Sequence, residues 1–259
     1  MEGRFLSSTR EGRGHKESLS AFLSRNPFPQ PLTLGFFFRE KMRAIHAIAP
    51  DQPFGEILEV GGGRSGLTAI LYPEARITNL DSNIEYAAAP CNRQERVEFV
   101  CGDAAGLPFD DLSFDAVTMF DLLEHIPDHR KAASEAKRVL RPGGALLVST
   151  PGDKWRFPYY SFMRPFCPDE EEMFAEWGHV RRGYSLAELD ALIPMTRQDY
   201  ATFITPLTVL CHDIAFSRLP FRLRRGICGA ITPLTWIGYA LHRPHGTGTE
   251  TATVWRKAD

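Results

Sequence analysis

Three glycines and one aspartate are the first residues in this chain with the types and spacing to do chemistry. Gly61, Gly62 and Gly63 follow the apolar run that ends at Val60, and Asp81 ends the next apolar run. Glycines there let the backbone turn sharply and approach a ligand closely. A carboxylate at the next strand end can accept both hydroxyls of a ribose. The pattern predicts a site for a cofactor containing adenosine, but alone it does not separate a dinucleotide from S-adenosylmethionine.

Two further acids favour S-adenosylmethionine. Glu59 precedes the glycines, where it suits a ligand that carries an amine or a positive charge and would repel a pyrophosphate. Asp103 ends a third apolar run and can accept a hydrogen bond from the amino group of adenine. The chain also contains no Tyr-x-x-x-Lys pair that would serve proton transfer in a dehydrogenase.

The elements that position these residues alternate between strand and helix. Helices are expected at 65–72, 83–88 and 128–140, and strands at 56–60, 76–81, 97–103, 114–121, 145–150, 198–205 and 249–257. Strands that alternate with helices indicate an α/β fold with a mostly parallel sheet covered on both faces. In such sheets ligands bind beyond the carboxyl ends of the strands, where the residues discussed above lie.

Five motifs in this order resemble those of class I S-adenosylmethionine-dependent methyltransferases, in the broad small-molecule branch similar to ubiquinone and sugar methyltransferases. They are EVGGGRSG, NLD, GDAAGLPFDDLSFDAV, LLEHIPD and VLRPGGALLVSTP. The resemblance is dense over 56–151 and continues weakly to residue 193. It implies a Rossmann-like seven-stranded sheet, mostly parallel with the last strand antiparallel.

The resemblance also implies a loop under the methionine part of the cofactor, made by Glu59, Gly61 and Gly63. One departure from the family pattern stands nearby, because Ser65 occupies a position where the family often has glycine. A serine there can cap the following helix. We therefore expect an adjusted geometry with cofactor binding retained.

The remaining cofactor contacts follow from the same resemblance. Asp81 is expected to hold the ribose diol, with Ser82 beside it. Asp103 and Ala104 are expected to face the adenine.

Beyond the fourth strand, the resemblance places Phe120 and Asp121 at the sulfonium end of the cofactor. His125 follows closely and is the candidate general base, because histidine titrates near neutral pH; a positioning role is the alternative. His125 and His129 have a spacing seen in metal sites, but Pro127 breaks any regular helix between them. We therefore expect no metal site.

Bulk properties limit the remaining choices. The formal net charge of −2 gives no general reason to expect a nucleic-acid partner. The five cysteines are odd in number and show no close pairing, which favours a reducing, cytoplasmic setting. We expect a flexible tail over 1–18 and one methyltransferase domain over 19–259. That domain comprises an N-terminal helical cap (19–50), the cofactor-binding core (56–151) and two insertions (152–184 and 206–248).

The first insertion is rich in aromatic residues and suggests a wall or lid over an apolar acceptor pocket, with ordinary packing as the alternative. His179, Arg181 and Arg182 follow and are either contacts for an anionic acceptor group or solvated surface charges. The expected acceptor is a small or lipid-linked molecule, methylated at oxygen. The alternatives are methylation at nitrogen or carbon, and a cofactor-binding subunit whose partner does the chemistry.

The second insertion contains Gly226–Leu241, which is uncharged over 16 residues. Pro233 lies in its middle, and four arginines precede it: Arg218, Arg222, Arg224 and Arg225. A basic flank next to an apolar block is typical of a segment that lies in a membrane surface without crossing it. We therefore expect either peripheral membrane contact through 218–241 or a cap packed on the sheet.

Overall fold

A seven-stranded sheet forms the centre of the computed structural model, which describes residues 15–28 and 30–259. The strand order is β3-β2-β1-β4-β5-β7-β6, and β7 runs antiparallel to both of its neighbours. The strands are β1 (Glu56–Val60), β2 (Arg76–Asp81), β3 (Val97–Cys101), β4 (Phe114–Phe120), β5 (Leu140–Pro151), β6 (Thr196–Phe203) and β7 (Glu250–Arg256). The expected sheet, with its antiparallel last strand, is confirmed.

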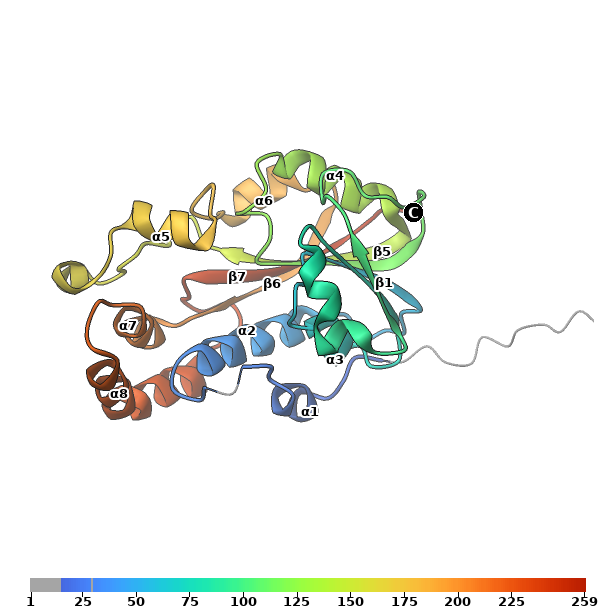
Figure 1. Ribbon diagram of the computed structural model, residues 1–259. Coiled ribbons are helices and arrows are strands. Elements are labelled where there is room, and N and C mark those ends of the chain that lie inside the picture. The colour runs from blue at the N-terminus through green and yellow to red at the C-terminus, as the bar shows by residue number, and fades with distance from the viewer. Residues whose placement is uncertain (1–14, 29) are drawn as a thin grey trace, which may run out of the picture.

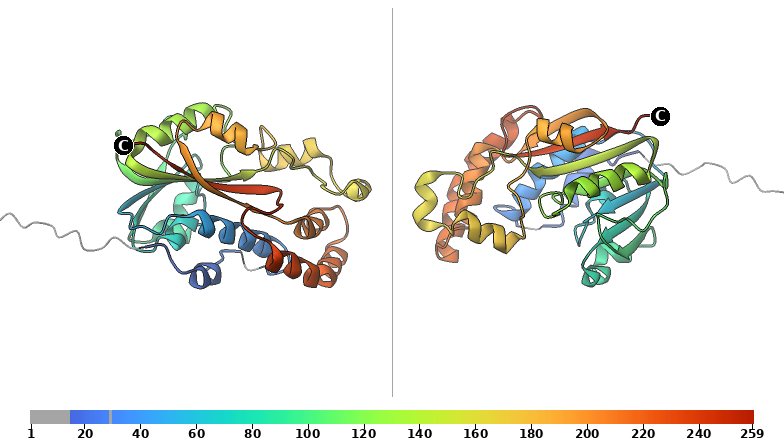
Figure 2. Two further views of the ribbon diagram at one scale, coloured as in Figure 1. Left: turned by 180° about the vertical axis from the view of Figure 1, so that it is seen from behind. Right: turned by 90° about the horizontal axis from the view of Figure 1, so that it is seen from above.

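Helices cover both faces of this sheet and extend past one end of it (Figure 1). They are α1 (Leu19–Ser24), α2 (Leu34–Ile48), α3 (Leu67–Leu71), α4 (His129–Val139), α5 (Glu170–Trp177), α6 (Leu186–Leu192), α7 (Pro206–Ala215) and α8 (Phe221–Leu241). Figures 1 and 2 show α4 and α6 on one face and α1, α2 and α3 on the other. Helices α5, α7 and α8 lie beyond the carboxyl ends of the parallel strands, where ligands bind in this architecture.

Two hydrophobic cores lie on opposite faces of the sheet. Ile57 and Ala145 belong to the core under α2, whereas their neighbours Leu58 and Leu146 belong to the core under α4. Successive side chains of a strand point to opposite faces, so each central strand needs apolar residues at nearly every position. This requirement explains the unbroken apolar runs in the sequence.

Several element boundaries differ from the expectation. Strand β5 begins at Leu140, where a strand had been expected only from residue 145, because Leu140 pairs with Phe114 before an irregularity in the ladder. The contacts of the domain begin before residue 19, since Lys16 donates hydrogen bonds to the carbonyls of His46 and Ala49. The rest of the expected tail, residues 1–14, lies outside the described residues.

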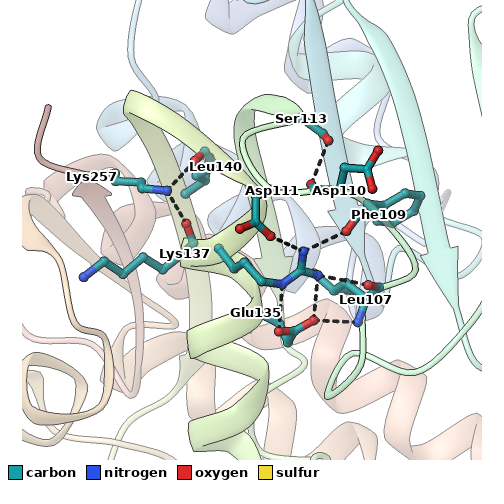
Figure 3. A network of polar contacts seen from close by, with 10 residues as sticks. Leu107, Phe109, Asp110, Asp111, Ser113, Glu135, Lys137, Leu140 and Lys257 are labelled. Atoms are coloured by element: carbon teal, nitrogen blue, oxygen red, sulfur yellow. Dashed lines mark hydrogen bonds and ion pairs between the residues drawn. The ribbon is translucent and has the colours of Figure 1, made fainter.

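Arg138 of α4 is hydrogen-bonded to the connection between β3 and β4, and Figure 3 shows its partners in that connection. Its guanidinium donates to the backbone carbonyls of Leu107 and Phe109 and to the carboxylates of Asp111 and Glu135. Glu135 in turn accepts the backbone N–H of Leu107. The network therefore fixes residues 107–111 to α4. This segment follows Asp103, one of the expected adenine contacts.

Candidate cofactor and acceptor site

The glycine loop after β1 is shaped by left-handed backbone conformations. Gly61 and Gly63 have φ angles of 73° and 54°, which cost glycine little and strain other residues. A Cβ on Gly61 would stand 2.6 Å from a methyl carbon of Leu122. Ser65 does not cap α3 as expected: its hydroxyl donates to the carbonyl of Gly62, and Gly66 is the N-cap residue.

Glu59 lies beneath this loop with only 2% of its surface exposed. Burial raises the pKa of its carboxyl to about 7, against the lowering effect of hydrogen bonds from Thr68. The carboxyl lines a cavity of about 220 Å³ together with Gly61, Gly62 and Phe120. A carboxyl buried in this way gains most from a cationic partner, because a positive charge offsets the cost of its ionisation.

Asp81 and Asp103 lie at the ends of β2 and β3, as predicted. The Oδ2 atom of Asp81 accepts the Gly63 N–H at 3.1 Å, and Oδ1 accepts the Asn83 N–H at 3.0 Å. Ser82, beside Asp81, is exposed. Asp103 is exposed, and its Oδ1 accepts the Ala105 N–H at 2.9 Å. The structure therefore fixes both carboxylates at the edge where a nucleoside would bind.

A second cavity, of about 170 Å³, adjoins the first. Phe28, Phe38 and Lys41 line both. The second cavity is mostly apolar, with Asp121 and Glu250 as its acidic residues; its other lining residues are Leu34, Phe37, Phe203, Ile204, His212 and Phe216. It therefore suits a largely apolar molecule with a polar group at one end.

Comparison with known proteins agrees with this geometry. Residues 58–148 match a family model described as a methyltransferase domain. Over 115 residues the chain is 40% identical to the phthiotriol/phenolphthiotriol dimycocerosates methyltransferase of Mycobacterium tuberculosis, covering 41% of this chain and 42% of that protein. Over 171 residues it is 29% identical to the demethylmenaquinone methyltransferase of Thermotoga maritima, covering 63% and 74%. Residues 58–148 therefore form a methyltransferase domain similar to those of S-adenosylmethionine-dependent methyltransferases.

The fold is likewise similar to that of a solved methyltransferase. The N-methyltransferase NodS from Bradyrhizobium japonicum, in complex with S-adenosyl-L-homocysteine, superimposes with a TM-score of 0.53 at 16% identity, covering 93% of this chain and 97% of that one. The sequence matches cover less than this structural superposition. They span 46% of the length of a relative from Mycolicibacterium smegmatis and 42% of the length of the one from Mycobacterium tuberculosis.

The residues of this methyltransferase domain fit S-adenosylmethionine as a cofactor. The amino group of S-adenosylmethionine is the kind of cation that the buried Glu59 carboxyl favours, and the cavity above Glu59 is lined by the glycine loop. Asp81 keeps lone pairs free for ribose hydroxyls, since each of its oxygens accepts one backbone N–H. The Ala104 side chain is buried in the core, so only its backbone is left for the adenine.

Lys41 is a residue of the site that the sequence analysis missed. It lies on α2, is 9% exposed and forms an ion pair with Asp121, the residue that follows β4. The signal was present in the sequence, because Lys41 stands on the helical stripe of Phe37, Ile45 and Ile48, where an apolar residue is expected. A charged residue on a buried stripe needs a charged partner.

Glu250 and His212 were also missed. Burial, and secondarily the charge of Asp121, raises the pKa of the Glu250 carboxyl to about 8. Burial lowers the pKa of the His212 imidazole to about 4, so this histidine is neutral at neutral pH. Glu250 begins the last strand and His212 lies on α7, so both reach the cavity from segments far along the chain from the cofactor motifs.

His125 and the two arginines have partners within the protein. The Nδ1 atom of His125 lies 3.1 Å from the carbonyl of Gly178. Arg181 donates to the carbonyls of Leu123, Ile126 and Pro127, and Arg182 pairs with Glu170. The expected contact of these arginines with an anionic acceptor group is therefore not supported, because both guanidiniums are already engaged.

A third cavity, of about 470 Å³, opens beside α8. It shares Leu34 and Phe216 with the second cavity and is lined also by Phe221, Arg224 and Arg225. A further hollow of about 720 Å³ lies at the opposite edge of the sheet, around Arg76 and other residues at the start of β2 and β3. We assign no role to that one, because ligands of parallel α/β sheets bind at the carboxyl ends of the strands.

Proposed function

We propose that this protein transfers a methyl group from S-adenosylmethionine to an oxygen of an amphipathic, lipid-linked acceptor. One observation supports this most strongly: the three cavities adjoin through shared lining residues. The cofactor would occupy the first cavity, the reactive head group the second, and an apolar tail the third. The names of two relatives, which specify phthiotriol dimycocerosates and demethylmenaquinone, support an acceptor of this kind.

The residues of the second cavity would align and desolvate the head group. S-adenosylmethionine supplies a methyl group bound to positively charged sulfur, so most of the catalysis can come from holding the acceptor in line with it. Phe28 and Phe38 line both cavities and would keep water from the point where the two reactants meet.

The charges of the second cavity support oxygen as the acceptor atom. The Lys41 ammonium lines this cavity in an ion pair with Asp121, and an oxygen that loses its proton would share that ammonium; a neutral amine acceptor would need no such help. If the nucleophile must lose a proton, His125 is the base that the sequence predicts, and this role stays a prediction.

Helix α8 supports a lipid-linked acceptor through its outer face. The residues exposed along it from 226 to 241 carry no charge, and Leu234, Ile237 and Leu241 are 49%, 50% and 75% exposed. Arg222 and Arg225 are exposed at the start of the helix. An apolar stripe with basic residues at one end suits an anionic membrane surface. None of the helices in the described part of the chain is long and apolar enough to cross a membrane.

The test is transfer of radiolabelled methyl groups to two phenols that share one head group, with and without a long isoprenoid tail. We expect the tailed phenol to have a KM at least about tenfold lower, because the tail buries several methylene groups. Phe216→Asp should remove this preference, while Phe162→Asp, at an exposed site, should retain it. A chain that binds the cofactor but methylates no hydroxyl in a lipid extract would contradict the proposal and favour a partner-dependent subunit.

A further inference from the structure

We propose that Glu124, His125 and His179 form a binding site for a divalent transition-metal cation. One ligand atom from each of these three residues can be chosen so that all lie within 4.8 Å of one another. Two imidazoles and one carboxylate are ligands that Zn²⁺, Co²⁺ and Mn²⁺ accept, and a set of three protein ligands leaves coordination positions open.

The two imidazoles each have a nitrogen suited to a metal. A carbonyl can only accept, so the 3.1 Å contact with Gly178 places the proton of His125 on Nδ1 and leaves the Nε2 lone pair free. Metal-bound histidines usually have such a hydrogen bond: the ring nitrogen that does not bind the metal donates to a backbone carbonyl or a carboxylate. Within the described residues, the Nδ1 atom of His179 is buried and has no hydrogen-bond partner.

The carboxyl of Glu124 is buried and forms little hydrogen bonding within the protein. Glu124 is 1% exposed, and among residues 15–28 and 30–259 the one hydrogen bond to its Oε2 is a long one, at 3.3 Å, from the hydroxyl of Thr150. A buried carboxyl with so little hydrogen bonding is a costly arrangement unless a cation offsets it.

The backbone brings the two ligand-bearing segments together firmly. The Val180 N–H donates to the carbonyl of Glu124 at 3.0 Å. Arg181 adds three hydrogen bonds to the carbonyls of Leu123, Ile126 and Pro127. His179 is thereby held against the loop after β4, although it lies after α5 in the aromatic insertion. The ring centroids of His125 and His179 lie 4.7 Å apart, with the rings edge to face.

This assignment departs from the expectation of no metal site, which rested on the spacing of His125 and His129. His129 does not join the cluster, because its Nδ1 contacts the hydroxyl of Tyr184. The partner of His125 is instead His179, more than fifty residues later in the sequence, which sequence spacing does not reveal.

The position of the site gives the cation a chemical role that rests on the proposed function. Asp121, three residues before Glu124, lines the acceptor cavity. A cation held by three protein ligands has an open coordination position, where it would bind the acceptor oxygen and favour loss of the oxygen's proton. It would also use the nitrogen of His125 that a general base needs, so the ligand and base roles of His125 exclude each other.

Calorimetry on the full chain, first dialysed against a chelator, tests the inference directly. Titration with Zn²⁺, Co²⁺ and Mn²⁺ should show one site, with a Kd below about 10 µM for Zn²⁺ and weaker binding of Mn²⁺. Bound Co²⁺ should give visible absorption bands from its ligand field. Glu124→Gln, His125→Ala and His179→Ala should each weaken binding at least about tenfold, whereas His129→Gln and His245→Ala should not.

Binding is measured without methyl transfer, so the two proposals can fail separately. Methyl transfer by a chain that binds none of the three ions below about 1 mM would overturn the metal site alone. Equal losses of affinity in the control and ligand variants would overturn it too. Should His179→Ala fail to fold by circular dichroism, Glu124→Gln and His125→Ala carry the same test.

Discussion

Lys41 of α2 and Asp121 after β4 form an ion pair where the two cavities at the carboxyl ends of the strands adjoin. Lys41 lines both cavities, and its charge also acts on Glu59 on the cofactor side and on Glu250 on the acceptor side. One lysine from the N-terminal cap therefore balances acids that belong to both halves of the site.

Replacing this lysine should destabilise the protein. Breaking a buried ion pair costs about 3–5 kcal/mol, but the Asp121 side chain is 33% exposed and solvent screens part of the loss. We expect Lys41→Met to lower the free energy of unfolding by about 2 kcal/mol, measured with urea. Lys154→Met, at an exposed site, is the matched control. Equal stability of the two variants would show that the pair contributes nothing.

Loss of the Asp81 carboxylate should weaken cofactor binding. We expect it to accept hydrogen bonds from the ribose, and losing a charged hydrogen bond costs about 1.5–3 kcal/mol. Asp81→Ala should therefore raise the Kd for S-adenosylhomocysteine at least about tenfold in calorimetry. Asp153→Ala, at an exposed acid, should leave it unchanged. An unaltered Kd in Asp81→Ala would remove this residue from the site.

The sequence predicted site residues best where a residue of suitable chemistry belongs to a motif at the end of a strand. Glu59 and Asp81 could be predicted because short motifs at strand ends place them, and the alternation of strands and helices fixes which ends meet. Glu250 could not, because it enters the site through tertiary packing of a segment without a local motif. His179 was noted in the sequence as a candidate contact for an anionic acceptor group, but its place beside Glu124 and His125 depends on tertiary packing. Lys41 lies between these cases, since a charged residue on an apolar stripe is visible but its partner is not.

Glu40 should make stability fall as pH rises. It is 1% exposed, and burial raises the pKa of its carboxyl to about 8 from an ordinary value of 4.5, against a hydrogen bond from Thr208. The protonated form is favoured in the folded state, so its contribution is complete below pH 4.5 and is lost as pH rises toward 8.

The matched variant is Glu40→Gln, which stays neutral at every pH. Thermal melting should show similar stability of the two proteins near pH 4.5 and an advantage for the variant at pH 8, on the order of 4 kcal/mol. The exposed Glu95→Gln should follow the wild type throughout. Parallel pH profiles of wild type and Glu40→Gln would mean that Glu40 is not buried as described.

Arg138 should matter for stability through the carbonyls and carboxylates that it bridges (Figure 3). Arg138→Met removes the charged partner of the buried Glu135 carboxylate and the hydrogen bonds to the carbonyls of Leu107 and Phe109. We expect a loss of about 2 kcal/mol, which corresponds to roughly 4–8 °C in Tm for a domain of this size. Arg76→Met, at a side chain that is 81% exposed, should shift Tm by much less. Similar shifts in both variants would show that the network adds no stability.

The outer face of α8 should bind anionic membranes. Its apolar stripe would enter the interface, and each arginine near the surface would add about 1 kcal/mol of attraction to anionic lipids. The wild type should float with anionic vesicles at low salt and less at high salt, because salt screens the attraction. Leu234→Asp with Ile237→Asp should abolish flotation, and Arg222→Gln with Arg225→Gln should remove the preference for anionic over neutral lipid. Leu112→Asp, at an exposed leucine far from α8 in the sequence, is the control for added charge. If the wild type stays in the soluble fraction at low salt, α8 is a packing element of the acceptor side, and its exposed stripe does not bind membranes.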